Sequence, residues 1–294
     1  MSGPPPMAGR PPGAAHPAAE PSATTVISGA GLVKRFGSTV ALAGVDVAVG
    51  AGESLAIMGP SGSGKSTLLH CLAGILRPDS GAVTLLGTRI DALNENRRSE
   101  LRRTRFGFVF QFGQLLPELP ADENVALPLM LGGVSAGRAV AGARTWFGPL
   151  GLGGMERRRP GELSGGQAQR VALARALVTG PSVIFADEPT GALDQTTGHE
   201  TMRLLVAATR HHGASLILVT HDPQVAAWCT RVVEVRDGHL LGDPPAAPAG
   251  PPGAAPSRGS PDGVPGDPGG GPREVPGGQP GPYGWGTGPG GEAA

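Results

Sequence analysis

The chain has 294 residues, of which 50 are glycine and 31 are proline, and its formal net charge at pH 7 is zero. Because positive and negative charges balance, the composition gives no sign of a nucleic-acid partner. The sequence contains no run of about 18 apolar residues, so we expect no membrane-spanning helix. The segment after Met1 lacks the apolar core of a secretory signal, and we expect none.

The two ends of the chain differ in composition from its middle. Residues 1–25 and 241–294 consist largely of Gly, Pro and Ala. Such segments lack the apolar side chains that would offset the entropy lost on ordering, so we expect both ends to be disordered. They either have no function of their own or serve in docking or solubility. The middle, residues 26–240, is long enough to bury the core of one domain.

The first part of this middle segment alternates short apolar runs with helical patterns and turn residues. Residues 53–59 predict a buried strand, and residues 64–76 predict a helix that ends at the turn-forming residues 77–81. Two further apolar runs, residues 82–87 and 106–111, predict strands.

The second part continues the same alternation. Residues 122–159 have a helical pattern that glycines interrupt. The segments after it are, in chain order, a helix at 164–178, a strand at 181–189, a helix at 199–213, a strand at 214–221 and a hairpin at 231–241 that turns at Asp237 and Gly238. Strands that alternate with helices predict an α/β fold, in which a mostly parallel sheet carries helices on both faces.

A glycine-rich loop, GPSGSGKS at residues 59–66, fits the pattern G-x-x-x-x-G-K-[ST] between a predicted strand and a predicted helix. Its glycines would let backbone N–H groups converge on phosphate oxygens, and the helix dipole would add positive potential. Lys65, one of two lysines in the chain, would place a compact ammonium at the β- and γ-phosphates, and Ser66 would ligate Mg²⁺. The candidate phosphate-binding residues are Gly59, Pro60, Ser61, Gly62, Ser63, Gly64, Lys65, Ser66 and Thr67. Kinases, GTPases, helicases and transporters all use such a loop.

Two adjacent carboxylates end the apolar run VIFADEP at residues 183–189. Asp187 is a candidate to hold Mg²⁺ through water. Glu188, the next residue along the strand, points to its other side and is a candidate to polarise an attacking water. The alternative is a solvated strand end without a catalytic role.

The sequence ELSGGQAQR at residues 162–170 separates the families that share the phosphate loop. It lies about a hundred residues after that loop and about twenty before the two carboxylates, and a helix follows it. LSGGQ in this position resembles the signature of ABC-type ATPases. The candidate signature residues are Ser164, Gly165, Gly166 and Gln167. Taken alone, a Ser-Gly-Gly sequence is also a common helix cap.

Four single residues extend this resemblance to residues 26–240 as a whole. Gln111 at the end of FVFQ resembles the Q-loop glutamine, which in this family touches Mg²⁺ and the attacking water. Asp194 in GALD resembles the D-loop, and His221 in LVTHD resembles the switch histidine that contacts the γ-phosphate. Phe36 in KRFG stands where the family places an aromatic residue under adenine. Their plainer alternatives are a strand-end amide for Gln111, a structural histidine for His221 and a core residue for Phe36.

The resemblance implies a P-loop NTPase fold with a RecA-type sheet core and an antiparallel β subdomain. It also implies a helical signature subdomain, at about residues 112–174, that projects as a separate lobe. ATP and Mg²⁺ are the implied cofactors. The implied partner is a second ATPase subunit in a head-to-tail dimer, with a homodimer expected, because the signature of one subunit closes on the ATP held by the other.

The segment from Phe108 to Gly133 carries a finer resemblance, through its Leu-Leu-Pro, Glu-Asn-Val and Leu-Pro-Leu pieces. These look like the lipoprotein-release and macrolide-export branch of ABC ATPases. We therefore expect a peripheral subunit at the cytoplasmic face of the cell membrane that powers a separate permease, of export or mechanotransmission type. The permease is expected to dock near Phe112–Leu131. The sequence does not identify the transported substrate.

Two other classes of function stay open from the sequence alone. One is the ATPase of a non-transport ABC complex, such as the bacterial cell-division type. The other is a regulatory nucleotide-binding module without turnover. A module of that kind is expected to lack Glu188 or His221, and both are present in this chain.

Overall fold

The computed structural model describes residues 25–241. The expected disorder of the two ends therefore lies outside the described residues, except that Thr25 begins the first strand and Leu241 ends the last. Within residues 25–241, no helix is both long and apolar enough to cross a bilayer.

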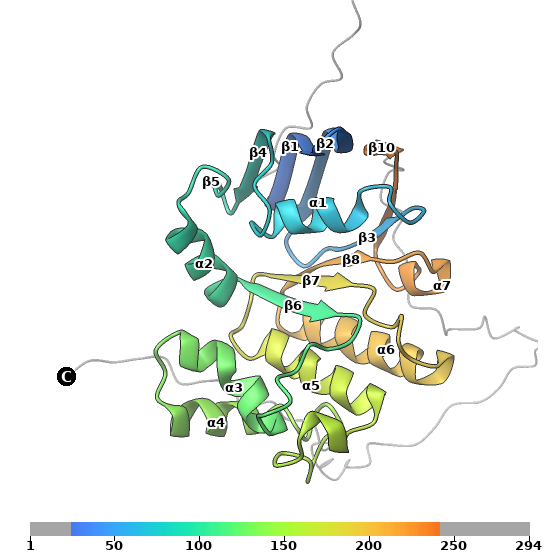
Figure 1. Ribbon diagram of the computed structural model, residues 1–294. Coiled ribbons are helices and arrows are strands. Elements are labelled where there is room, and N and C mark those ends of the chain that lie inside the picture. The colour runs from blue at the N-terminus through green and yellow to red at the C-terminus, as the bar shows by residue number, and fades with distance from the viewer. Residues whose placement is uncertain (1–24, 242–294) are drawn as a thin grey trace, which may run out of the picture. The chain divides into compact units, whose positions relative to one another are not determined.

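A six-stranded sheet lies at the centre of the fold (Figure 1). Its order is β10-β9-β3-β8-β7-β6, and all neighbours are parallel except β10, which pairs with β9 in the predicted hairpin. The strands are β3 Ser54–Met58, β6 Phe106–Phe110, β7 Val183–Asp187, β8 Ser215–Val219, β9 Arg231–Arg236 and β10 His239–Leu241. The predicted mostly parallel α/β sheet is confirmed. Because parallel strands end at the same edge, the loops after β3, β6, β7 and β8 meet there.

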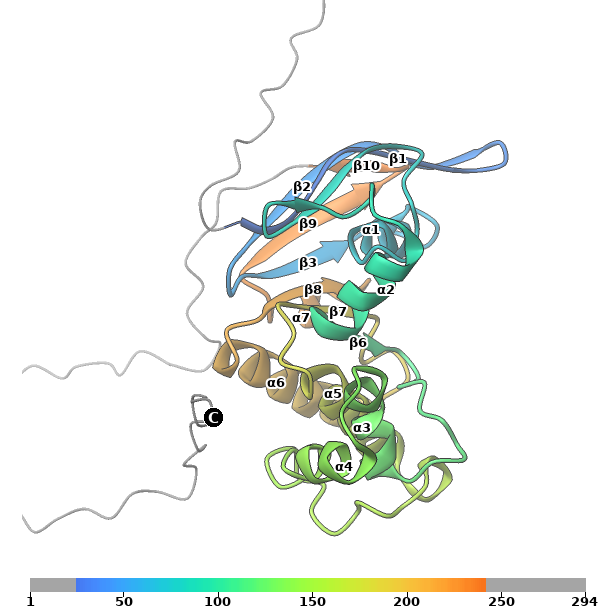
Figure 2. The same cartoon turned by 90° about the vertical axis from the view of Figure 1, so that its left-hand side faces the viewer.

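A second, antiparallel sheet has the order β2-β1-β4-β5. Its strands are β1 Thr25–Phe36, β2 Thr39–Gly50, β4 Ser80–Leu85 and β5 Thr88–Arg89. This sheet is the antiparallel subdomain that the family resemblance implied. Figure 2 shows the long β1–β2 hairpin on one side of the molecule, with α3 Ala121–Leu131 and α4 Ala136–Arg144 at the opposite end.

Helix α1, Lys65–Leu72, lies between the two sheets. Its buried leucines Leu68, Leu69 and Leu72 share a hydrophobic core with both sheets, which contribute Val45 and Phe185 among others. The helix ends before the predicted residue 76, because Gly74 adopts a left-handed conformation with φ 63°.

The other face of the six-stranded sheet is covered by α5, Gly165–Leu177, and α6, Gln195–His211 (Figure 1). Helices α3 and α4 pack beyond α5, and Val125 of α3 and Phe147 belong to the same hydrophobic core as Ile184 of β7. The predicted helical segment 122–159 therefore consists of α3 and α4 followed by turns, and a short 3₁₀ helix at Pro160–Glu162 and then α5 come after it.

Two further helices had no counterpart in the sequence pattern. Helix α2, Glu95–Thr104, has no buried residue and so no apolar stripe that a sequence pattern could detect. Asn94 caps it by accepting a hydrogen bond from Arg97 N at 3.0 Å. Helix α7, Pro223–Ala226, is a single turn after β8, with Asp222 as its cap.

Candidate functional site

The loop between β3 and α1 has a backbone that requires glycine at two positions. Gly59 has φ 143° and Gly64 has φ 108°, both in the left-handed half of the map. A Cβ on Gly59 would lie 2.1 Å from Val235 O, and a Cβ on Gly64 would lie 2.3 Å from Ala41 O. The loop is therefore pressed between neighbouring strands, with the N-terminus of α1 directly behind it.

Lys65 opens α1 and is 8% exposed. Its Nζ donates a hydrogen bond to Pro60 O at 2.8 Å, so the ammonium lies over the loop and not in solvent. Within residues 25–241 the hydroxyl of Ser63 is buried without a hydrogen-bond partner. A loop that holds an ammonium, a helix N-terminus and an unpaired hydroxyl has the chemistry of a phosphate cradle.

Ser66 and Asp187 bring two oxygen atoms together beside that loop. Ser66 Oγ donates to Asp187 Oδ1 at 3.3 Å, and this bond joins the start of α1 to the end of β7. Burial raises the pKa of Asp187 above its usual value, and the hydrogen bond from Ser66 opposes this. A hydroxyl and a carboxylate are ligands that Mg²⁺ takes alongside phosphate oxygens and water, so the pair fits this ion.

Glu188 and His221 approach each other from the ends of β7 and β8. Glu188 Oε1 lies 2.8 Å from His221 Nδ1, and Thr220 Oγ1 lies 3.4 Å from Glu188 Oε2. Glu188 has φ 48°, an unusual value for a residue with a side chain, and its N–H donates to Val219 O at 3.0 Å. The side chain of His221 is 71% exposed, so the pair opens toward solvent.

Gln111 follows β6 and lies beside the segment that follows Glu188. A Cβ on Gly191 would lie 2.8 Å from Gln111 Nε2, so glycine leaves the space that this side chain fills. The structure therefore brings Gln111 to the loop after β7.

The signature residues begin α5 as a reciprocal cap. Ser164 Oγ accepts from Gln167 N at 3.3 Å, and Gln167 Oε1 accepts from Ser164 N at 2.9 Å. Gly166 allows α5 to approach α6, because a Cβ there would lie 2.3 Å from Thr197 Cγ2. Ser164 and Gln167 therefore form a helix cap, as the plainer interpretation of this sequence expected, and a cap does not exclude a further role as the signature. Helix α5, which begins at this signature, lies on the face of the sheet opposite α1, the helix that follows the phosphate loop (Figure 1).

Two further candidates lie at the edge of this region. Asp194 caps α6 by accepting from Thr197 N at 3.1 Å, and its hydrogen bonds with Thr197 lower the pKa of Asp194. Phe36 ends β1 and is 50% exposed, so it is not a core residue. The ammonium of Lys34 lies 5.6 Å from the centre of the Phe36 ring, which leaves an aromatic surface beside a positive charge.

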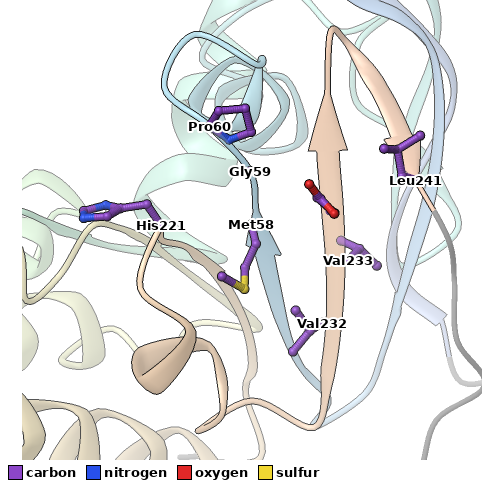
Figure 3. A pocket seen from close by; sticks show the side chains of 8 residues that line it. Met58, Gly59, Pro60, His221, Val232, Val233 and Leu241 are labelled. Atoms are coloured by element: carbon purple, nitrogen blue, oxygen red, sulfur yellow. The ribbon is translucent and has the colours of Figure 1, made fainter.

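An open pocket of about 610 Å³ adjoins the phosphate loop on the side of β9 (Figure 3). Pro60 and His221 form its rim, and Met58, Val232 and Val233 give it an apolar wall. Lys65 and Glu188 are not among its lining residues. The pocket therefore borders the candidate site without containing its charged groups.

Sequence reasoning did not single out Gln169. This side chain is 2% exposed, and its Nε2 donates to Phe110 O and to Pro189 O, each at 2.8 Å. The sequence did contain a signal for its burial. Gln169 lies at helical spacing from the apolar Ala172, Leu173 and Ala176, which places it on the buried side of α5.

Known proteins are similar to most of the part of the chain that the structure describes. The family model described as ABC transporter matches residues 42–191. The lipoprotein-releasing system ATP-binding protein LolD of Bordetella pertussis is 48% identical over 202 residues, which is 69% of this chain and 87% of that protein. The macrolide export ATP-binding/permease protein MacB of Chromobacterium violaceum is 44% identical over 248 residues, 81% of this chain and 38% of that larger protein.

Solved structures show the same fold. The dimeric structure of MJ0796, a bacterial ABC transporter cassette, has a TM-score of 0.69 at 37% identity and covers 74% of this chain and 97% of its own. A dimeric post-hydrolysis state of the same cassette, bound to ADP and Pi, has a TM-score of 0.68 at 36% identity, with the same coverage.

Proposed function

The chain belongs to the ABC transporter family of ATPases, and we propose that it powers a separate membrane permease of export or mechanotransmission type. As a member of this family it is an ATP-binding subunit that hydrolyses ATP, and such subunits work as dimers with membrane partners. Its fold and the order of its motifs agree with that membership.

The observation that carries hydrolysis in this chain is the contact between Glu188 and His221 at 2.8 Å. Glu188 is placed to accept the proton of an attacking water, as a general base does. His221 fixes that carboxylate and is exposed enough to reach a γ-phosphate. The phosphates themselves would lie on the N–H groups of the loop from Gly59 to Thr67, with the Lys65 ammonium against them.

We assign the Mg²⁺ position to Ser66 and Asp187, with Gln111 nearby at the end of β6. When bound, the ion neutralises charge on the β- and γ-phosphates. The adenine ring would stack on the exposed face of Phe36.

The separation of the signature from the phosphate loop supports a head-to-tail homodimer. Helix α5, which the signature begins, and helix α1, which Lys65 begins, lie on opposite faces of the sheet, so a second copy would supply the signature that closes each site (Figure 1). The N-terminus of α5 then contributes a second anion-binding helix end to the bound ATP. Asp194 would lie at the same interface, and the dimeric cassette of similar fold supports this arrangement.

A groove of about 360 Å³ between β6, α2, α3 and α5 is a candidate permease contact. Phe108, Phe110 and Leu131 line it, with Arg102, Arg103 and Arg175 also in its wall. Phe112, two residues after Phe110, is 76% exposed. An apolar groove next to the loop of Gln111 suits an amphipathic helix of a permease. Docking there would hold the chain at the cytoplasmic face of the membrane, and the similarity to lipoprotein-releasing and macrolide-export proteins supports that branch.

The substitution Glu188→Gln tests this function. The variant keeps the phosphate loop, so it should bind ATP and accumulate as an ATP-bound dimer in size-exclusion chromatography. Its rate of ATP hydrolysis should fall by about 100-fold or more, because the general base is lost. Glu100→Gln, at an exposed ion pair with Arg97, is the matched control and should behave as wild type. Turnover by Glu188→Gln at the wild-type rate would contradict the assignment of Glu188 as the base.

A further inference from the structure

We propose that Gln169 is a positioning residue that ties the signature helix α5 to the two loops carrying Gln111 and Glu188. The inference rests on the proposed function and deepens it, because it concerns how closure at the signature reaches the hydrolytic groups. The amide of Gln169 hydrogen-bonds to Phe110 and Pro189, neither of which is assigned to nucleotide, so the role proposed for it is to place other groups.

The geometry is a single amide nitrogen shared between two carbonyl groups. Gln169 Nε2 donates to Phe110 O, at the residue before Gln111, and to Pro189 O, at the residue after Glu188, both at 2.8 Å. An amide NH₂ has two hydrogens, so both donors are used. The side chain is 2% exposed, and water does not reach this position readily to replace either bond.

The loop after β6 is held to α5 by a second side chain as well. Arg175 donates to Gly113 O at 2.6 Å and to Gln114 O at 2.7 Å. The space at Gly113 is also bounded by Gln169, because a Cβ there would lie 3.4 Å from Gln169 Oε1. Arg175 thus fixes the far part of this loop, whereas Gln169 joins its first residues to the loop of Glu188.

The signature cap lies at the start of the same rigid helix. Ser164 and Gln167 close the N-terminus of α5, and Gln169 is about half a turn further along. The bond to Pro189 O is buried, and loss of its donor would cost free energy, so the loop of Glu188 should follow Gln169 when α5 shifts. Phe110 O also accepts from Gly113 N at 3.1 Å, and the bond from Gln169 joins this turn to the same amide. Movement of the signature onto a partner's nucleotide would therefore displace Gln111 and Glu188 together.

The substitution Gln169→Leu removes both N–H donors and replaces the amide with an apolar side chain that is only slightly shorter. If Gln169 positions the hydrolytic loops, KM for ATP should stay within about twofold of wild type while kcat falls about tenfold or more. Gln169→Glu keeps the shape and at most one donor, and carries the same expectation should Gln169→Leu fail to fold. Thermal denaturation of each variant shows that it is folded at the assay temperature.

Thr209→Val is the matched control, because Thr209 is 3% exposed and its hydroxyl donates to Leu205 O at 2.7 Å within α6, away from the site. It should lower the Tm while leaving kcat and KM unchanged. The proposal is overturned if a folded Gln169 variant keeps kcat within about twofold of wild type, or if Thr209→Val loses kcat to the same extent. Absence of ATP hydrolysis in the wild type would instead overturn the proposed function.

Discussion

Glu188 Oε1 and His221 Nδ1 lie 2.8 Å apart at the ends of two adjacent parallel strands, β7 and β8. Glu188 comes one residue and His221 two residues after the end of a mostly buried strand, so the sheet holds their backbones while their side chains reach the open edge. The backbone of Glu188 adopts the left-handed region at this contact, with φ 48°. A strained conformation at this position is typical of a functional site.

Replacement of His221 should slow turnover without removing nucleotide binding. His221→Ala leaves the Glu188 carboxylate with the long contact to Thr220 alone, so its orientation is lost while the phosphate loop is intact. We expect kcat to fall about 10- to 100-fold with little change in ATP affinity. His221→Gln keeps a hydrogen-bonding group and should recover part of that loss. Equal activity of His221→Ala and wild type in a steady-state ATPase assay would remove His221 from the mechanism.

The raised pKa of Asp187 predicts opposite effects of Asp187→Asn on stability and on function. A folded-state pKa above the unfolded value contributes stability that is fully present below the unfolded pKa and is lost as the pH rises through the folded pKa. At neutral pH the ionised carboxylate therefore costs stability in the nucleotide-free protein. Asp187→Asn removes that cost and should raise the Tm by about 2–4 °C.

The same variant should lose most of the rise in Tm that MgATP gives to the wild type, because the ion loses its carboxylate. Scanning calorimetry at several pH values, with and without MgATP, measures both effects. The stabilisation should shrink as the pH is lowered through the folded pKa of Asp187, where the wild-type carboxyl is protonated too. A nucleotide-free Asp187→Asn less stable than wild type at pH 7 would show that burial of this charge is not costly.

The site could be predicted from sequence where its geometry is local. The loop 59–66 needs a strand before it, a helix after it and glycines between, and all three are visible in the sequence. The parallel sheet followed from the alternation of strands and helices. In contrast, glycines interrupt the pattern of β1, and the exposed helix α2 is too polar to show one. Strand β2 alternates Val45, Val47 and Val49 toward the core, a signal that was present in the sequence and was not used. For this region the family resemblance alone implied an antiparallel subdomain.

Contacts between distant segments could not be predicted in this way. Gln169 forms its two hydrogen bonds with carbonyls of β6 and of the loop after β7, and nothing in its neighbouring residues indicates those acceptors. The early end of α1 likewise depends on Gly74, which a helical pattern tolerates until tertiary packing selects its left-handed conformation. The roles assigned to all of the site residues, Gln111, Asp194 and Phe36 among them, stay predictions.

Lysine should be required at position 65. The Lys65 side chain is 8% exposed within a loop whose glycines already touch neighbouring strands, so a larger planar guanidinium has no space there. Lys65→Arg should therefore weaken ATP binding about tenfold or more despite keeping the charge, as measured by titration calorimetry. Arg89→Lys, at the ion pair with Asp91, exchanges the same two residue types and should leave ATP affinity unchanged. Wild-type affinity in Lys65→Arg would show that charge alone suffices.

Phe112 should matter for the membrane partner and not for the isolated ATPase. Its ring is 76% exposed, and burying it against a permease would contribute about 1.5–3 kcal/mol. Phe112→Ser should keep kcat and KM in the purified subunit and reduce the share of the chain recovered with membranes from its native cells. Leu86→Ser, 52% exposed at the turn between β4 and β5, should leave membrane recovery unchanged. Equal recovery of Phe112→Ser and wild type would place the docking surface elsewhere.

Gly107 of β6 should be needed for the contact between β6 and α5. A Cβ there would lie 2.3 Å from the backbone oxygen of Ala176, which cannot move without shifting the helix. Gly107→Ala should therefore lower the free energy of unfolding by about 1–3 kcal/mol in urea titrations. Gly137→Ala, at an open position in α4, should raise it by about 0.4–1 kcal/mol.

Both glycine substitutions add one methyl group to the chain. At Gly107 the methyl group meets the backbone of α5, so its effect reports packing, whereas at Gly137 it meets open space, so its effect reports helix propensity. Since β6 leads to Gln111 and α5 begins at the signature, a displaced contact at Gly107 should also lower kcat, whereas Gly137→Ala should not change it. If Gly107→Ala were as stable and as active as wild type, β6 and α5 could move apart without cost. The coupling proposed for Gln169, which spans the same two elements, would then lose its structural basis.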